Sequence, residues 1–160
     1  MDQPATVQET PEDASDESAH HGATDHGYVL DEQIGYLLRK AYQRNAVIFS
    51  EAVQDLTPTQ FAVMARLTEL GSVSQNQLGR TVGLDVATTK GVIDRLVGRG
   101  LVQTRKDPND RRRQQISLTS EGLAHFTAHA KIGLDVSEAT LAPLTAAEQR
   151  TFTRLIKKLQ

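Results

Sequence analysis

Apolar side chains recur at helical intervals through residues 29–53 of the chain. The intervals are three, four and seven positions, and the residues are Ile34, Leu38, Ala41, Ile48 and Ala52. This spacing places the side chains on one face, so it predicts one long amphipathic helix. A second helix is predicted after Thr57, Pro58 and Gln60, which combine an N-cap, a proline in the first turn and a glutamine three residues after the cap. We expect it to end at Gly71.

Two shorter helices are predicted next, on either side of a glycine turn. Ser74 and Gln77 have the spacing of a capping box for the first of them, which Gly83 interrupts. Asp85 is the expected N-cap of the second, which runs to Gly100. Its predicted buried face consists of Thr89, Val92, Ile93, Leu96 and Val97.

A short hairpin is predicted after these helices. Residues 101–105 and 114–118 have the alternation of strands, with Val102 on the inner face of the first and Ile116 on the inner face of the second. Between them, residues 106–113 (KDPNDRRR) combine turn-forming Asp, Pro and Asn with basic side chains. This pattern indicates a basic wing.

Two further long helices follow, the first capped by Thr119 and the second by a capping box of Thr145 and Glu148. Together with the helix in residues 29–53, they carry more apolar surface than a small core can cover. We therefore expect a homodimer that forms through the N- and C-terminal helices. The predicted fold class is mainly α with a small β-wing, a winged helix-turn-helix with six helices.

Charge divides the chain into a tail and a body. The net charge is −2, but residues 1–31 hold eight acidic and no basic residues, which leaves 18 basic and 12 acidic residues in the rest. Residues 1–28 also have few large apolar side chains, so we expect a disordered acidic tail followed by one domain over residues 29–160. The near-neutral balance therefore does not exclude a polyanionic partner.

Basic residues are in excess in residues 74–113, which contain nine basic and four acidic residues. Such a charge excess by itself is also typical of a solvated face. Combined with two short helices and a basic wing, it predicts binding of double-stranded DNA, with the second short helix in the major groove. Lys90 can donate to guanine, Thr88 can contact a base or a phosphate, and Ala87 can touch a thymine methyl. The candidate DNA-binding residues are Ser74, Gln75, Asn76, Ala87, Thr88, Lys90, Gly91, Arg95, Asp110, Arg111, Arg112 and Arg113.

The same segment resembles the MarR family of bacterial winged-helix regulators. The motifs that carry the resemblance are residues 74–80 (SQNQLGR), 92–102 (VIDRLVGRGLV), 107–113 (DPNDRRR) and 116–122 (ISLTSEG). The resemblance implies a symmetric dimer, a pseudo-palindromic operator and release by a small ligand. It also implies that Asp110 orients Arg112 toward the minor groove, which agrees with the ability of a carboxylate to hold a guanidinium in one pose. Many members carry Arg where this chain has Gly91, so the operator sequence is not carried over.

Residues 33–44 (QIGYLLRKAYQR) and 56–61 (LTPTQF) are similar to the branch that controls aromatic-compound catabolism. This similarity implies an effector that is an aromatic acid or an aromatic acyl-coenzyme A thioester. The candidate ligand-binding residues are Arg39, Tyr42, Arg44, Asn45, Phe49, Phe61 and Met64. Their mix of cations and aromatic rings suits such a ligand. In the alternative, the cations solvate the first helix and the aromatic rings fill a dimer core.

Other classes of function have weaker support in the sequence. There is no cysteine, so disulfides and thiolate metal sites are excluded. His125 and His129 lie four residues apart, and the tail holds His20, His21 and His26, but no third ligand is evident beside the pair. We predict no enzyme, cofactor or metal, although a protein-interaction module on the same fold stays open. No membrane-spanning stretch or secretion signal is recognisable, so we expect a cytoplasmic protein that does not bind membranes.

Overall fold

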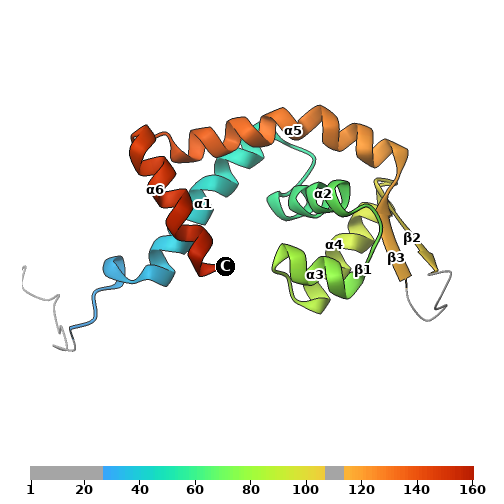
Figure 1. The fold of residues 1–160 in the computed structure, drawn as a ribbon, viewed down its shortest axis with the longest axis horizontal. Coiled ribbons are helices and arrows are strands. Elements are labelled where there is room, and N and C mark those ends of the chain that lie inside the picture. The colour runs from blue at the N-terminus through green and yellow to red at the C-terminus, as the bar shows by residue number, and fades with distance from the viewer. Residues whose placement is uncertain (1–26, 107–113) are drawn as a thin grey trace, which may run out of the picture.

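The computed structural model describes residues 27–106 and 114–160 of the chain (Figure 1). Within them it contains short 3-10 turns at Leu30–Glu32 and Lys157–Leu159 and the α-helices α1 (Ile34–Ala52), α2 (Pro58–Leu70), α3 (Gln75–Val82), α4 (Val86–Gly98), α5 (Ser120–Leu141) and α6 (Ala146–Ile156). Figure 1 shows α2, α3, α4 and the sheet at one end, α1 and α6 at the other, and α5 running along both. The six predicted helices are therefore confirmed.

Local hydrogen bonds explain where these helices begin. Thr57 caps α2 and Thr145 caps α6 through complete capping boxes, in which the N3 side chain also returns to the cap backbone. Ser74 accepts a hydrogen bond from the Gln77 backbone N–H at 3.3 Å, which is the serine half of the predicted box. Asp85 and Thr119 cap α4 and α5 in the same way.

The helix-turn-helix depends on two glycines. Gly83 ends α3 with φ +69°, a left-handed conformation that disfavours residues with a side chain. Gly79 lies where α3 meets α4, and a Cβ there would fall 2.7 Å from the Thr89 hydroxyl oxygen. The missing side chain at Gly79 thus lets the two helices pack closely.

The sheet has three antiparallel strands in the order β1-β3-β2. The predicted hairpin is confirmed as β2 (Val102–Lys106) paired with β3 (Gln114–Leu118). A third strand, β1 (Val73–Ser74), pairs Val73 with Ile116 and was absent from the sequence prediction. Two residues are too few for a recognisable strand pattern, and only pairing with β3 defines this one.

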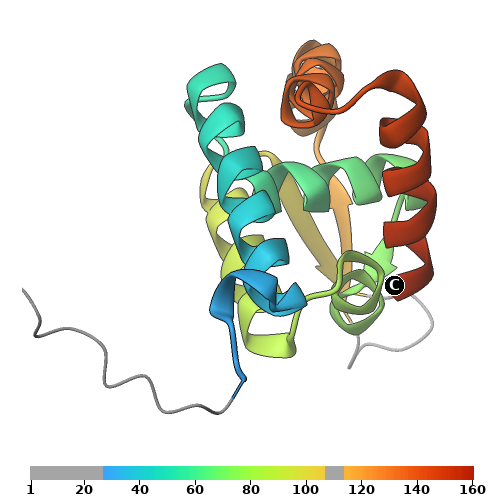
Figure 2. The same ribbon diagram turned by 90° about the vertical axis from the view of Figure 1, so that its left-hand side faces the viewer.

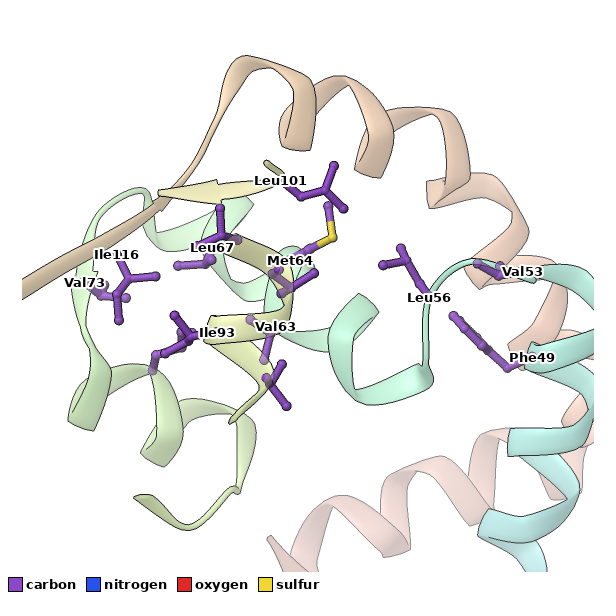
Figure 3. Close-up of a cluster of buried hydrophobic side chains, with 14 of the residues drawn as sticks. Phe49, Val53, Leu56, Val63, Met64, Leu67, Val73, Ile93, Leu101 and Ile116 are labelled. Atoms are coloured by element: carbon purple, nitrogen blue, oxygen red, sulfur yellow. The ribbon is translucent and has the colours of Figure 1, made fainter. Parts of the chain in front are cut away.

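The core lies between α2, α4 and the sheet, as the side chains of Met64, Leu67, Ile93 and Ile116 show in Figure 3. Of the predicted face of α4, Thr89, Val92, Ile93 and Leu96 are buried. Val97 is 39% exposed, so its predicted burial is wrong. Successive helical residues are about 100° apart, which places Val97 at the edge of the stripe formed by the other four.

The order of helices, turn and hairpin confirms the winged helix-turn-helix fold. In Figure 2, α1, α5 and α6 lie outside the unit formed by α2, α3, α4 and the sheet. Among the described residues, none of the helices is long and apolar enough to cross a membrane. The division into a tail and one domain stays a prediction, because residues 1–26 lie outside the described part.

Candidate nucleic-acid interface

The candidate residues at the start of α3 lie beside α4. Ser74 and Gln75 are half-buried, whereas Asn76 is exposed. The Gln75 side-chain amide donates to the Val86 carbonyl at 3.4 Å, which joins the first turn of α3 to the first residue of α4. Asn76 is the residue of this group most open to a partner.

On α4, the candidates Ala87, Thr88, Lys90 and Arg95 are exposed. The Thr88 hydroxyl donates to the Asp85 carboxylate at 2.5 Å, and the Thr88 backbone N–H donates to the other carboxylate oxygen at 2.8 Å. These bonds lower the pKa of Asp85 below its ordinary value of 3.8, the hydroxyl bond more than the backbone bond. Because its proton is used by the cap, the Thr88 hydroxyl can only accept a further hydrogen bond from a partner.

Lys90 and Arg95 supply positive charge to the exposed side of α4. Lys90 pairs with Asp94 at 2.5 Å, but their side chains are 65% and 60% exposed. The pair therefore contributes little to folding stability and can open toward a partner. Gly91 leaves space beneath the Arg95 guanidinium, since a Cβ there would lie 3.9 Å from Arg95 Nη1. The backbone at Gly91 therefore permits close approach of a partner to α4.

Two basic residues of β2 extend this positive surface. Arg105 and Lys106 are exposed at the end of β2. Asp110, Arg111, Arg112 and Arg113 lie outside the described residues, so their roles stay predictions.

A cluster of charged and polar side chains that the sequence did not predict lies at the C-terminal end of α4. Arg99, the residue that follows α4, donates through Nη2 to Asp55 Oδ2 at 2.8 Å and through Nη1 to the Asp55 carbonyl. His125 Nε2 lies 2.7 Å from the same carboxylate oxygen. Burial raises the pKa of Asp55, but the hydrogen bonds from His125 and Arg99 outweigh it, and the pKa is lowered overall. No local pattern joins Asp55 to partners 44 and 70 positions away.

The candidate ligand residues divide into three groups. Phe49 and Met64 are buried, and Phe61 packs between Phe49 and Phe126 at centroid distances of 5.5 and 5.1 Å. Arg44 donates to the carbonyls of Ala139 and Thr140, and Asn45 donates to the Thr140 hydroxyl at 3.0 Å. Phe61, Arg44 and Asn45 thus join α1 and α2 to α5.

Arg39 and Tyr42 form the third group, which remains exposed on α1. The Arg39 guanidinium lies 5.2 Å from the centre of the Tyr36 ring. Tyr42 lines a cavity of about 370 Å³ between α1, α2 and the turn that joins α3 to α4. The other lining residues are Pro58, Thr59, Ala62, Val82 and Leu84.

Two adjoining helices with an exposed polar face and a basic hairpin define a winged-helix DNA-binding protein. The MarR family model matches residues 56–113, which include α2, α3, α4 and the wing. The repressor NicR of Pseudomonas putida is 38% identical over 134 residues, which span 82% of this chain and 85% of NicR. The chain belongs to the MarR family.

Solved structures agree with this assignment. A probable transcriptional regulator from Pseudomonas aeruginosa matches with a TM-score of 0.79 at 44% identity, over 82% of this chain and all of that one. BpsR of Bordetella bronchiseptica, whose DNA binding is regulated by 6-hydroxynicotinic acid, matches with a TM-score of 0.78 at 34% identity, over 82% of this chain and 96% of BpsR. The chain is accordingly a transcriptional regulator and not an enzyme.

Proposed function

We propose that this chain is a homodimeric repressor that binds a pseudo-palindromic operator and releases it when a small aromatic acid binds. The similarity to the repressor NicR supports repression of transcription and not activation. The exposed candidates on α3 and α4, with Arg105 and Lys106 at the base of the wing, support DNA binding. In this proposal α4 enters the major groove and the wing contacts the adjacent backbone or minor groove.

Exposed apolar side chains on the outer helices support the homodimer. On α1, Ile34 is 65% exposed, and on α5 Leu134 is 72% exposed. Phe152, Leu155 and Leu159, along and just beyond α6, are 39%, 48% and 71% exposed. Apolar surface on several helices at one end of a chain is typical of an interface between copies. A two-fold axis there would present two copies of α4 to two half-sites of one operator.

The cavity beside Tyr42 is the observation that carries the effector proposal. Its volume of about 370 Å³ lies in the range of small-molecule sites. Val82 and Leu84 line it and flank Gly83, the turn that sets α4 against α3. A ligand in this cavity therefore presses on the turn that positions the recognition helix. The regulation of BpsR by 6-hydroxynicotinic acid favours a small aromatic acid over an acyl-coenzyme A thioester.

Among the predicted cations of α1, Arg39 is the better partner for the carboxylate of such a ligand. Arg39 lies three residues before Tyr42 on α1, and in this proposal its guanidinium turns from the Tyr36 ring, 5.2 Å away, toward the cavity when the ligand binds. Arg44 already donates to two carbonyls of α5. We therefore assign ligand binding to Arg39 and Tyr42, and a structural role to Arg44.

The test measures operator affinity with and without 6-hydroxynicotinic acid, other aromatic acids and aromatic acyl-coenzyme A thioesters. Coupling between sites is typically about 1 to 3 kcal/mol, so the effective acid should raise the operator Kd by roughly 5- to 150-fold. Arg39→Gln should remove this response and preserve operator affinity, whereas the neighbouring Lys40→Gln should retain both. A response to thioesters alone, or an unchanged response in Arg39→Gln, would contradict the effector assignment.

A further inference from the structure

A cluster of two histidines and one carboxylate lies between α5 and the loop that joins α1 to α2. Asp55, in the loop between α1 and α2, and His125 and His129 on α5 each offer a ligand atom, and these atoms lie within 4.8 Å of one another. The two imidazole rings stack at a centroid distance of 4.5 Å. The loop thus supplies the third ligand that the sequence did not place beside the histidine pair.

His129 has its tautomer fixed for metal binding. Its Nδ1 lies 2.8 Å from the His125 backbone carbonyl, and a carbonyl oxygen only accepts hydrogen bonds. Nδ1 therefore carries the proton, and Nε2 presents a lone pair. A hydrogen bond from the other ring nitrogen to a carbonyl is the usual support of a metal-binding histidine.

His125 points Nε2 at Asp55, whereas its Nδ1 is buried and has no hydrogen-bond partner among the described residues. An orphaned N–H would be costly there, so the proton is on Nε2 and is donated to the carboxylate. A metal ion at Nε2 would replace this proton, leaving the neutral ring with its hydrogen on Nδ1. The Glu121 carbonyl lies four residues before His125, as the His125 carbonyl lies four residues before His129, and is the candidate acceptor for that hydrogen.

We propose that Asp55, His125 and His129 form a site for a divalent transition-metal ion, with zinc as the best match. Two imidazoles and one carboxylate are common zinc ligands and leave a fourth position for water. Magnesium and calcium favour sites made of oxygen ligands alone. The Arg99 guanidinium, 2.8 Å from Asp55 Oδ2, is the cation that a bound metal would have to displace.

The experiment uses the full chain with His20, His21 and His26 replaced by glutamine, so that these histidines cannot contribute to the measured metal binding. Zinc is titrated against a chromophoric chelator, and one ion per chain is expected. His129→Gln and Asp55→Asn in this background should each weaken zinc binding by at least about 10-fold. Arg99→Gln should strengthen it, because a competing positive charge is removed.

Cobalt provides an independent measurement on the same proteins. The tail-substituted chain should give the visible absorption of cobalt in a site of low coordination number, and His129→Gln should abolish it. Circular dichroism confirms that each variant is folded. The proposal is overturned if the tail-substituted chain takes up no zinc, or if its zinc affinity is the same after His129→Gln and Asp55→Asn.

Discussion

Arg99 at the end of α4 is joined to Asp55 in the loop between α1 and α2, with 2.8 Å between Nη2 and Oδ2 and a second bond to the Asp55 carbonyl. The two residues connect the DNA-binding unit to the helix that carries the effector candidates. Their side chains are 34% and 44% exposed, so solvent weakens the ionic part of the contact.

The first prediction follows from this pairing. A double-mutant cycle with Asp55→Ala and Arg99→Ala should give a coupling free energy of about 0.5 to 1 kcal/mol in urea unfolding, decreasing with added salt. Because its guanidinium is held by Asp55, Arg99 should not act as a phosphate contact. The salt dependence of operator binding by Arg99→Gln should therefore equal that of the unsubstituted protein, and a slope lower by about one unit would show a phosphate contact instead.

The second prediction distinguishes Lys90 from the wing. Lys90→Ala should cost about 1 to 3 kcal/mol on the operator and less on scrambled duplex, because Lys90 is expected to contact a base edge. Arg112→Ala should weaken binding to both duplexes and lower the salt slope by about one unit. Asp110→Ala should also weaken binding, since an Arg112 without a carboxylate to orient it loses its pose.

Asp94→Asn serves as a control in the same series of binding measurements. Asp94→Asn frees Lys90 from its partner and removes a negative charge near the phosphates, so it should leave binding unchanged or tighten it. Equal operator-to-scrambled ratios for Lys90→Ala and Arg112→Ala would contradict base contact by Lys90. Tighter binding by Asp110→Ala would contradict the orienting role of Asp110.

The third prediction concerns two helical glycines with opposite surroundings. A Cβ at Gly122 would lie 1.9 Å from the Leu101 carbonyl oxygen, so Gly122→Ala should destabilise the fold by about 3 kcal/mol or more. At Gly91 the nearest atom would lie 3.9 Å away, and the better helix propensity of alanine should stabilise Gly91→Ala by about 0.5 to 1 kcal/mol. Chemical unfolding of both variants measures the difference, and a stabilised Gly122→Ala would mean that α5 does not pack on Leu101 as described.

The fourth prediction is a pH dependence at the N-cap of α4. The hydrogen bonds from Thr88 lower the pKa of Asp85 below its ordinary value of 3.8. A carboxylate whose pKa is lower in the folded state contributes stability above its unfolded pKa and loses it as the pH falls through the folded value. The stability advantage of the wild type over Asp85→Ala should thus be constant from pH 7 to about 5 and decline below about pH 4.

Urea unfolding from pH 7 to 3 measures this decline. In Asp85→Asn the cap cannot titrate. The difference in the free energy of unfolding between Asp85→Asn and Asp85→Ala should therefore vary less across the same pH range. An advantage of Asp85 that grows on acidification would show that its pKa is raised and not lowered in the folded protein.

Local signals in the sequence determined the helices and the hairpin. Thr57, Asp85, Thr119 and Thr145 are caps whose partners lie three residues away, so the information that starts each helix is contained in four consecutive residues. Apolar spacing then defined the buried face of α4 except at its edge, at Val97, whereas Ile34 and Leu38 of the predicted apolar face of α1 are exposed in the single chain. The exposed side of α4 followed from the same patterns.

Only the tertiary structure decided how distant residues combine. Arg44 looks like a ligand-binding cation in the sequence, but two backbone carbonyls at the end of α5 accept hydrogen bonds from its guanidinium. The strand β1 exists because β3 pairs with it, and the cavity beside Tyr42 exists because α1 and α2 meet the turn at Gly83. The cluster of Asp55, Arg99 and His125 depends on the packing of three segments that no periodicity relates. Sequence periodicity reports on one element at a time, whereas these sites depend on how separate elements are placed by a shared core.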